Sequence, residues 1–272
     1  MAAAPAWAEP EFKVLPFPLD RGTAARVVVE GLGPEAALSG LFDGRRIFFF
    51  PAGGKMIGLF GADVMLSPGR YPLRLKWNGG QKEIELPVRD RSYGLRSITV
   101  PENQVKLSKA DQDRAAQESR LVQEALAVKS PEKLWQGPWT DPVDGAVSSP
   151  FGRQTRINGV LNPRPHSGVD FEARPGTPVK APADGLVILT GFHFFAGGSV
   201  YLDHGQGLIS MYFHLSKIEV KPGDRVKRGE ILALSGASGR VSGPHLHYGL
   251  YLDRARIDPV AFHRLTALLP RK

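Results

Sequence analysis

Short apolar runs separated by turn residues dominate the first hundred residues of the chain. The runs are RVVVEGL, RIFFFPAG, KMIGLFG, YPLRLKW and KEIELPV, and turn sequences such as SPGR and NGG divide them. Apolar residues that alternate with polar ones between turn signals are typical of strands with one buried face. Their spacing of roughly 10 to 14 residues predicts a small, sandwich-like antiparallel β module over residues 9–100.

Residues 101–135 have a different character. LSKADQDRAAQESRLVQEALAV contains good helix formers and many charges, and Ser108 stands where a helix N-cap is expected. Its apolar positions are few: Ala115, Leu121, Val122 and Leu126. We therefore expect one or two solvated helices that link the two ends of the chain.

Strand patterns return in residues 136–272. PVKAPADGLVILTG, SVYLDHGQG, LISMYFHLS and HLHYGLYLD follow one another, with glycine or Pro-Gly at the corners. The whole chain contains 31 glycines and 23 prolines, which favours short strands and tight turns over long helices. The predicted fold class is mainly β, with an N-terminal sandwich-like module, a short helical linker and a C-terminal antiparallel β domain.

Charge and cysteine content narrow the chemistry. The net charge is +8, but the Lys and Arg residues are scattered and no nucleic-acid-binding motif occurs, so we expect no nucleic acid partner. A basic surface also suits an acidic polymer such as a cell wall. The absence of cysteine excludes disulfides, thiolate metal sites and a cysteine nucleophile.

The first residues indicate export. Ala6-Trp7-Ala8 before Glu9-Pro10 resembles the small-residue end of a secretory signal, so we interpret residues 1–8 as the remnant of a signal peptide. No run of 18 apolar residues occurs, and no transmembrane segment is expected. The predicted location is the periplasm or the cell envelope.

Two histidines stand one residue apart in GPHLHYGL. Side chains alternate faces along a strand, so His245 and His247 should point to one side and Leu246, Tyr248 and Leu250 to the core. Two adjacent imidazoles on one face of a strand are unusual in an apolar core and typical of a metal-binding or catalytic site.

Two further segments carry candidate chemistry. PHSGVDF places His166 and Asp170 four residues apart, and SMYFH places His214 at the end of an apolar strand. The strand pattern predicts a core face made of Ile209, Met211, Phe213 and Leu215, which leaves His214 on the other face with Ser210 and Tyr212.

Four histidines and one aspartate exceed what a catalytic zinc needs. Such a zinc keeps three protein ligands and leaves its fourth position to water. The two remaining imidazoles are then available for proton transfer and for stabilising a developing oxyanion. This set of groups fits the hydrolysis of a carbonyl compound, most naturally an amide.

HSGVD, YFHLS and GRVSGPHLHYGL together resemble the zinc metallopeptidases of the M23 family, of the LytM and lysostaphin type. The likeness extends over roughly residues 145–262 and includes SSPFGR, GTPVKAPADG, LDHGQG, VKPGDRVKRGEIL and IDPVAF. The sandwich-like module followed by helices is similar to members of this family from Gram-negative bacteria.

The resemblance implies a role for each candidate residue. His166, Asp170 and His247 would hold Zn²⁺, whereas His214 and His245 would assist the water and the tetrahedral intermediate. Several members carry a tyrosine upstream of the first motif, but GRQTRINGVLNPRPHSGVD contains none. We expect Arg156 and Asn158 in this stretch to contact substrate.

The implied substrate is bacterial peptidoglycan, cut in its cross-links or stem peptides. A second interpretation is a non-catalytic or latent wall-binding regulator of other hydrolases, with a protein partner that the sequence does not name. Some relatives that lost ligands act in this way, whereas all five positions are filled here. Of the other histidines, His204 is expected to make a structural hydrogen bond, His193 to line a groove, and His263 to lie at the surface.

Overall fold

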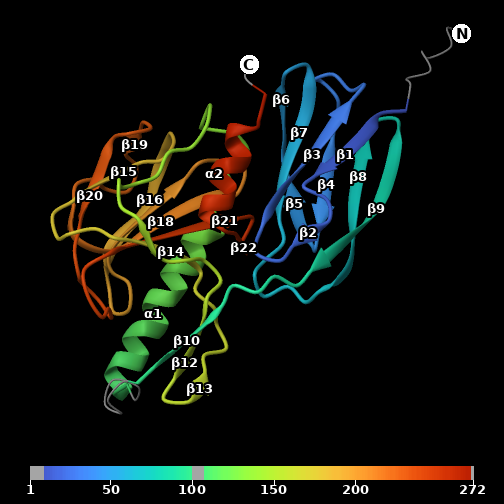
Figure 1. Cartoon of the computed structure of the whole chain (residues 1–272). Helices are drawn as coiled ribbons and strands as arrows, with labels where there is room; N and C mark the ends of the chain where they lie inside the picture. The colour runs from blue at the N-terminus through green and yellow to red at the C-terminus, as the bar shows by residue number, and fades with distance from the viewer. Residues whose placement is uncertain (1–8, 100–106, 271–272) are drawn as a thin grey trace, which may run out of the picture.

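The structure, a computed structural model, describes residues 9–99 and 107–270 and is mainly β (Figure 1). The proposed signal remnant at residues 1–8 lies outside this range. The N-terminal strands are β1 (Glu11–Leu15), β2 (Leu19–Asp20), β3 (Ala24–Glu30), β4 (Ser39–Phe42), β5 (Arg45–Ile47), β6 (Phe49–Ala52), β7 (Lys55–Gly61), β8 (Gly69–Trp77) and β9 (Gly80–Arg89).

These nine strands form the predicted sandwich. One sheet has the order β1-β3-β7-β6 and the other β2-β9-β8-β4-β5. Both sheets contribute to one core, in which Val27, Leu73 and Leu86 are fully buried. Along β8 the exposed Arg74 separates the buried Leu73 and Leu75, so the alternation seen in the sequence corresponds to an inner and an outer face.

A strand and one described helix follow the sandwich: β10 (Leu95–Ile98) and α1 (Lys109–Leu126). The hydroxyl of Ser108 accepts a hydrogen bond from the backbone N–H of Asp111, which confirms the predicted N-cap. Only Ala125 and Leu126 of α1 are buried, and Leu121 is 52% exposed. The helix is therefore solvated along most of its length.

The C-terminal elements are β11 (Val147–Ser149), β12 (Gln154–Ile157), β13 (Val160–Leu161), β14 (Gly168–Phe171), β15 (Pro178–Lys180), β16 (Gly185–His193), β17 (Gly197–Asp203), β18 (Leu208–Ile218), β19 (Arg225–Val226), β20 (Ile231–Ser235), β21 (Leu246–Leu252), β22 (Ala255–Arg256) and α2 (Pro259–Ala267). Ten of these strands form one sheet with the main order β11-β14-β21-β18-β17-β16-β19. Every pair described within this sheet is antiparallel, as the sequence predicted.

Residues 95–98 do not join the sandwich. Strand β10 runs parallel to β12, which forms a hairpin with β13, and these three strands make a separate small sheet. In Figure 1 this sheet lies beside α1, below the main sheet. The local apolar pattern of a four-residue strand does not indicate its partner, which is why the pairing was not predicted. The division of the chain into segments stays a prediction.

An apolar seam joins the sandwich to the large sheet. Trp135, Trp139 and Phe262, which all follow α1 in the sequence, pack in one cluster with residues of the sandwich, namely Phe50, Ile57 and Leu59. In Figure 1, α2 lies between the two parts. Beside the seam, the guanidinium of Arg256 donates two hydrogen bonds to the buried carboxylate of Asp63, at 2.9 and 2.6 Å.

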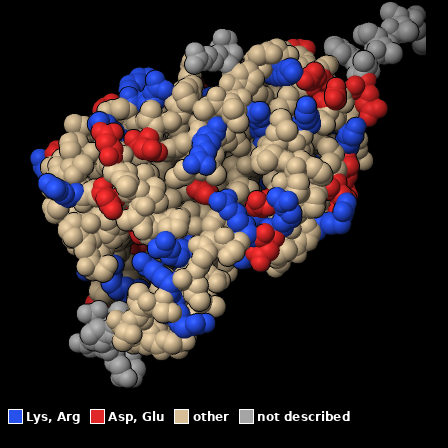
Figure 2. Space-filling model, viewed as in Figure 1, with Lys and Arg blue, Asp and Glu red and all other residues tan. Residues whose placement is uncertain are grey.

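The surface carries both signs of charge. Figure 2 shows Lys and Arg interspersed with Asp and Glu over both parts of that face, with no continuous basic patch across it. Among the described residues, neither helix is long and apolar enough to cross a membrane.

Candidate metal and catalytic site

The three histidine-bearing segments meet on neighbouring strands of the large sheet. Strand β14 pairs with β21 so that Asp170 lies opposite His247, and β18, which carries His214, is the next neighbour of β21. His166 precedes β14, and His245 forms an isolated bridge with Gly236 just before β21. Sheet pairing therefore gathers all five predicted residues from distant parts of the sequence.

Three of them form a compact donor set. Asp170 Oδ1 lies 3.0 Å from His166 Nε2 and 2.9 Å from His247 Nδ1, and these two nitrogens are 3.0 Å apart. Donor atoms of a tetrahedral zinc, with bonds of about 2.0–2.1 Å, are about 3.3 Å apart. The His166, Asp170 and His247 group therefore fits zinc in donor chemistry and nearly in spacing.

The surroundings set the protonation states that a metal needs. His166 Nδ1 lies 3.0 Å from the carbonyl oxygen of Pro150, which can only accept, so Nδ1 carries the proton and Nε2 is free. Burial raises the pKa of Asp170, but its close interactions with the His166 and His247 rings outweigh burial and hold that pKa well below its usual range. Burial lowers the pKa of His247. The carboxylate of Asp170 is therefore ionised, and the lowered pKa of His247 favours its neutral form, as metal binding requires.

Gly168, in the H-S-G-V-D motif, makes room for the His247 ring. A Cβ at this position would lie 2.4 Å from the carbonyl oxygen of Tyr248 and 2.7 Å from His247 Nε2. On another side, the ring of Phe213 stacks on His247 with a centroid distance of 5.3 Å and an interplanar angle of 4°. The imidazole is thus held between a ring and a backbone that tolerates no side chain.

His214 occupies a β-bulge, which the sequence did not predict. Its φ is 65°, and the pairing of β17 with β18 shifts register here. The extra residue places Leu215 in the core cluster with Tyr212, whereas Phe213 packs with Ile209 and Met211. The prediction that Leu215 shares the face of Phe213 was wrong, because strict alternation cannot continue through a bulge.

His214 and His245 lie beside the donor set with matching tautomers. The Nδ1–H of His214 donates to the carbonyl of Ser238 at 3.0 Å, and that of His245 to the carbonyl of Gly243 at 2.8 Å. Each Nε2 is therefore left as an acceptor, and that of His245 is 3.7 Å from Asp170 Oδ1. The two rings are 4.8 Å apart, and burial lowers the pKa of His214 to about 4.

Three backbone carbonyls orient the imidazoles, and no pattern in the sequence predicted them. They belong to Pro150, Ser238 and Gly243. Every residue carries a carbonyl, so no side-chain pattern reveals which ones accept. The only available signal was the concentration of glycine and serine before His245.

Arg156 and Asn158 belong to the β12–β13 hairpin, which is part of the small three-stranded sheet and not of the large one. Arg156 is an exposed residue of β12, and Asn158, with φ 48°, begins the turn to β13. The hairpin is nevertheless anchored beside the site, because the N–H of His166 donates to the carbonyl of Arg153 at 3.0 Å.

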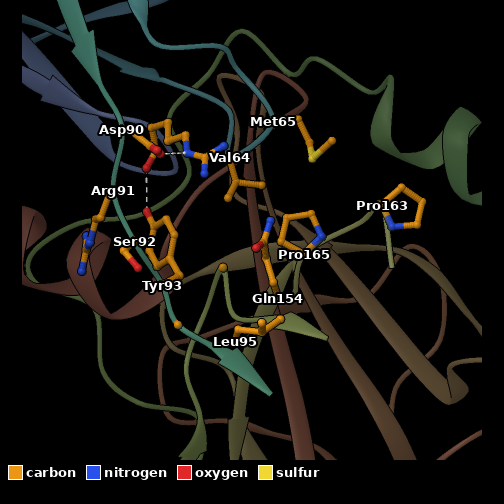
Figure 3. Close-up of a pocket in the computed structure, with 13 residues that line it drawn as sticks. Val64, Met65, Asp90, Arg91, Ser92, Tyr93, Leu95, Gln154, Pro163 and Pro165 are labelled. Atoms are coloured by element: carbon orange, nitrogen blue, oxygen red, sulfur yellow. Dashed lines mark hydrogen bonds and ion pairs between the residues drawn. The ribbon is translucent and has the colours of Figure 1, made fainter. Parts of the chain in front are cut away.

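A pocket of about 320 Å³ is lined by none of the three donor residues, and Figure 3 shows the residues that do line it. Its lining comes from the sandwich at Met65, from the connection at Tyr93 and from the hairpin stretch at Gln154 and Pro165. Pro165, which lines the pocket, directly precedes the donor residue His166 in the sequence.

Of the remaining histidines, His204 follows its prediction and His263 does not. His204 is fully buried, with Nδ1 2.7 Å from the carbonyl of Asp184 and Nε2 2.7 Å from the hydroxyl of Ser210. The side chain of His263 is only 10% exposed because it is held between Asp141 and the phenol of Tyr248. His193 ends β16 and is half-buried.

The chain is similar to known proteins over this region and beyond it. The model of peptidase family M23 matches residues 164–259. A solved structure from Pseudomonas aeruginosa, assigned to peptidase M23, is 34% identical, with a TM-score of 0.74, and the match covers 92% of this chain and 96% of that one.

Curated relatives match a smaller share of the chain. The peptidoglycan DD-endopeptidase ShyA of Vibrio cholerae is 44% identical over 37% of this chain and 26% of its own length. The DD-carboxypeptidase/endopeptidase Mpg of Neisseria meningitidis is 38% identical over 42% of this chain and 26% of its own length. The chain thus spans about a quarter of the length of these curated relatives.

Proposed function

Since the chain belongs to peptidase family M23, we propose that it is a zinc-dependent endopeptidase that hydrolyses peptide cross-links or stem peptides of bacterial peptidoglycan. The observation that carries this proposal is the donor set of His166, Asp170 and His247 with two further imidazoles beside it. The names of the relatives ShyA and Mpg support the same substrate class.

In this proposal, His166, Asp170 and His247 hold the zinc. When bound, zinc lowers the pKa of its water to about 7 and polarises a carbonyl, which supplies a nucleophile at neutral pH. The carboxylate of Asp170 contributes the negative charge, and the backbone carbonyl at Pro150 keeps the His166 ring turned toward the set.

His214 and His245 serve as the proton-transfer pair. Each has its Nδ1–H tied to a carbonyl, so each Nε2 can accept a proton during attack and return one to the leaving amine. Once protonated, an imidazole also stabilises the oxyanion of the tetrahedral intermediate. Burial lowers the pKa of His214 to about 4, so its ring is neutral at neutral pH, as a base requires.

Substrate contacts and location complete the proposal. The exposed hairpin with Arg156 and Asn158 offers a cation and an amide to a peptide that carries carboxylates. The formal charge of +8 suits such a polymer, and a location in the periplasm or the cell envelope follows from where the substrate occurs.

The test is mass spectrometry of muropeptides released from purified sacculi by the protein, with and without a zinc chelator. We expect chelator-sensitive conversion of cross-linked dimers to monomers, restored by added zinc, and the masses identify the bond. A protein shown to hold one zinc per chain that releases nothing would instead be a latent enzyme or a wall-binding regulator.

A further inference from the structure

The connection between β20 and β21 carries both carbonyls that orient the proton-transfer pair. Ser238 supplies the acceptor for His214 and Gly243 the acceptor for His245. The position of this connection therefore fixes the orientation of two imidazoles. Arg240 lies between the two carbonyls in the sequence, and its side chain is exposed.

The connection is locked against the turn between β16 and β17. The N–H of Arg240 donates to the carbonyl of Phe195 at 3.0 Å. The hydroxyl of Ser238 accepts from the N–H of Gly198 at 2.8 Å and donates to the carbonyl of Leu215 at 2.6 Å. Gly197 leaves no room for a Cβ, which would lie 2.3 Å from the Ser238 hydroxyl. Arg240 thus projects from a fixed backbone.

The side chain of Arg240 is ordered by an aromatic ring and not by an acid. Its guanidinium carbon lies 4.5 Å from the centroid of the partly exposed Phe195 ring. Within residues 9–99 and 107–270, no carboxylate lies within ion-pair distance of it, whereas the exposed Arg74 and Arg89 pair with Glu83 and Asp20. Stacking leaves the donor edge of the guanidinium free.

We propose that Arg240 is a specificity-determining residue that binds a carboxylate of the peptidoglycan stem peptide beside the scissile bond. This inference rests on the proposed function. A stacked guanidinium presents its N–H groups in a planar fork that matches a carboxylate, and stacking has already limited the rotamers that binding must fix. Because Arg240 is exposed to solvent, we expect it to make a modest contribution to substrate affinity and none to the chemical step.

The test compares steady-state kinetics of the full chain on a cross-linked muropeptide that has free carboxylates at its diamino acids and on the same muropeptide with those groups amidated. We expect R240Q to raise KM about 5-fold on the free acid with kcat nearly unchanged. Amidation should weaken wild-type binding by a similar factor and should leave R240Q unaffected. R240K should be intermediate, because it keeps the charge and loses the fork.

Controls separate this role from a structural one. R70Q removes an exposed arginine of the sandwich strand β8 and should change neither KM nor kcat. A fall in kcat with R240Q, or equal sensitivity of R240Q and wild type to amidation, would overturn the inference. A zinc-loaded wild type that cleaves neither muropeptide would overturn the proposed function and this inference together.

Discussion

Asp170 and His247 are direct partners across the antiparallel pair β14–β21, and Asp170 Oδ1 lies 2.9 Å from His247 Nδ1. Opposed residues in such a pair are held a few ångströms apart by the backbone ladder. A slip by one residue would turn His247 to the core face. The geometry of the donor set is therefore a property of strand register, with His166 added from the preceding turn.

Removing a donor should remove the metal. Asp170→Ala and His247→Ala are each expected to lose bound zinc and activity together, because a catalytic zinc needs three protein ligands and each variant keeps only two. The measurement is zinc per chain by atomic emission beside muropeptide cleavage. Full zinc occupancy in either variant would contradict the assignment.

The proton-transfer pair should behave differently. His214→Ala and His245→Ala are expected to retain zinc and to lose about 10²–10⁴-fold in kcat, the usual contribution of general acid–base catalysis. The same zinc and kinetic measurements apply. Loss of zinc in His245→Ala with retention in His247→Ala would reverse the roles of the two neighbours.

Gly168→Ala should displace the His247 ring and so disturb the donor set. The added Cβ would meet the carbonyl of Tyr248 at 2.4 Å and the His247 ring at 2.7 Å, and overpacking of this kind typically costs about 1–3 kcal/mol. We expect a lower free energy of unfolding and weaker zinc binding, measured by denaturant titration and by competition with a chelator. Gly69→Ala is the matched control, because its Cβ would make only an ordinary contact, and equal effects would refute the argument.

His204 should make stability depend on pH. Burial lowers its pKa from 6.5 to about 4, so the unfolded chain binds the extra proton between these values. The contribution of His204 to the free energy of unfolding is fully present above pH 6.5. It falls on acidification toward pH 4, by at most about 1.4 kcal/mol per pH unit. Denaturant titrations in chelator should show a steeper loss for wild type than for His204→Asn. Parallel slopes would show that His204 does not titrate on unfolding.

The Asp63–Arg256 pair should matter more than a surface pair. Asp63 is 3% exposed, so Asp63→Ala leaves the guanidinium partly buried without its counter-charge, at a cost of about 3 kcal/mol in the free energy of unfolding. Glu83→Ala, which breaks the exposed pair with Arg74, should cost about 1 kcal/mol or less. Denaturant titration of both variants measures the difference, and a similar cost for both would argue against a special role.

Much of the fold and the candidate site was predictable because it depends on local patterns. The alternation around His245 and His247 predicted their shared face, and the turn-separated runs predicted the sandwich. His166, Asp170 and His247, the ligand set that the family resemblance implied, lie together in the structure, and their role as ligands stays a prediction.

The features that were not predicted depend on contacts between different segments, which no local sequence pattern reveals. The bulge at His214 adds one residue against a partner strand that lies elsewhere in the sequence. The partner of β10 and the burial of His263 are likewise set by distant segments. The carbonyls of Ser238 and Gly243 have no side-chain signature.

The apolar seam limits how far this protein is modular. A catalytic part excised from its sandwich would present Trp135, Trp139 and Phe262 to water and would leave Arg256 without Asp63. Producing the C-terminal part as an independent protein would require redesign of the apolar surface that the sandwich now covers. A substitution on one side of the seam is therefore expected to change the packing of the other side as well.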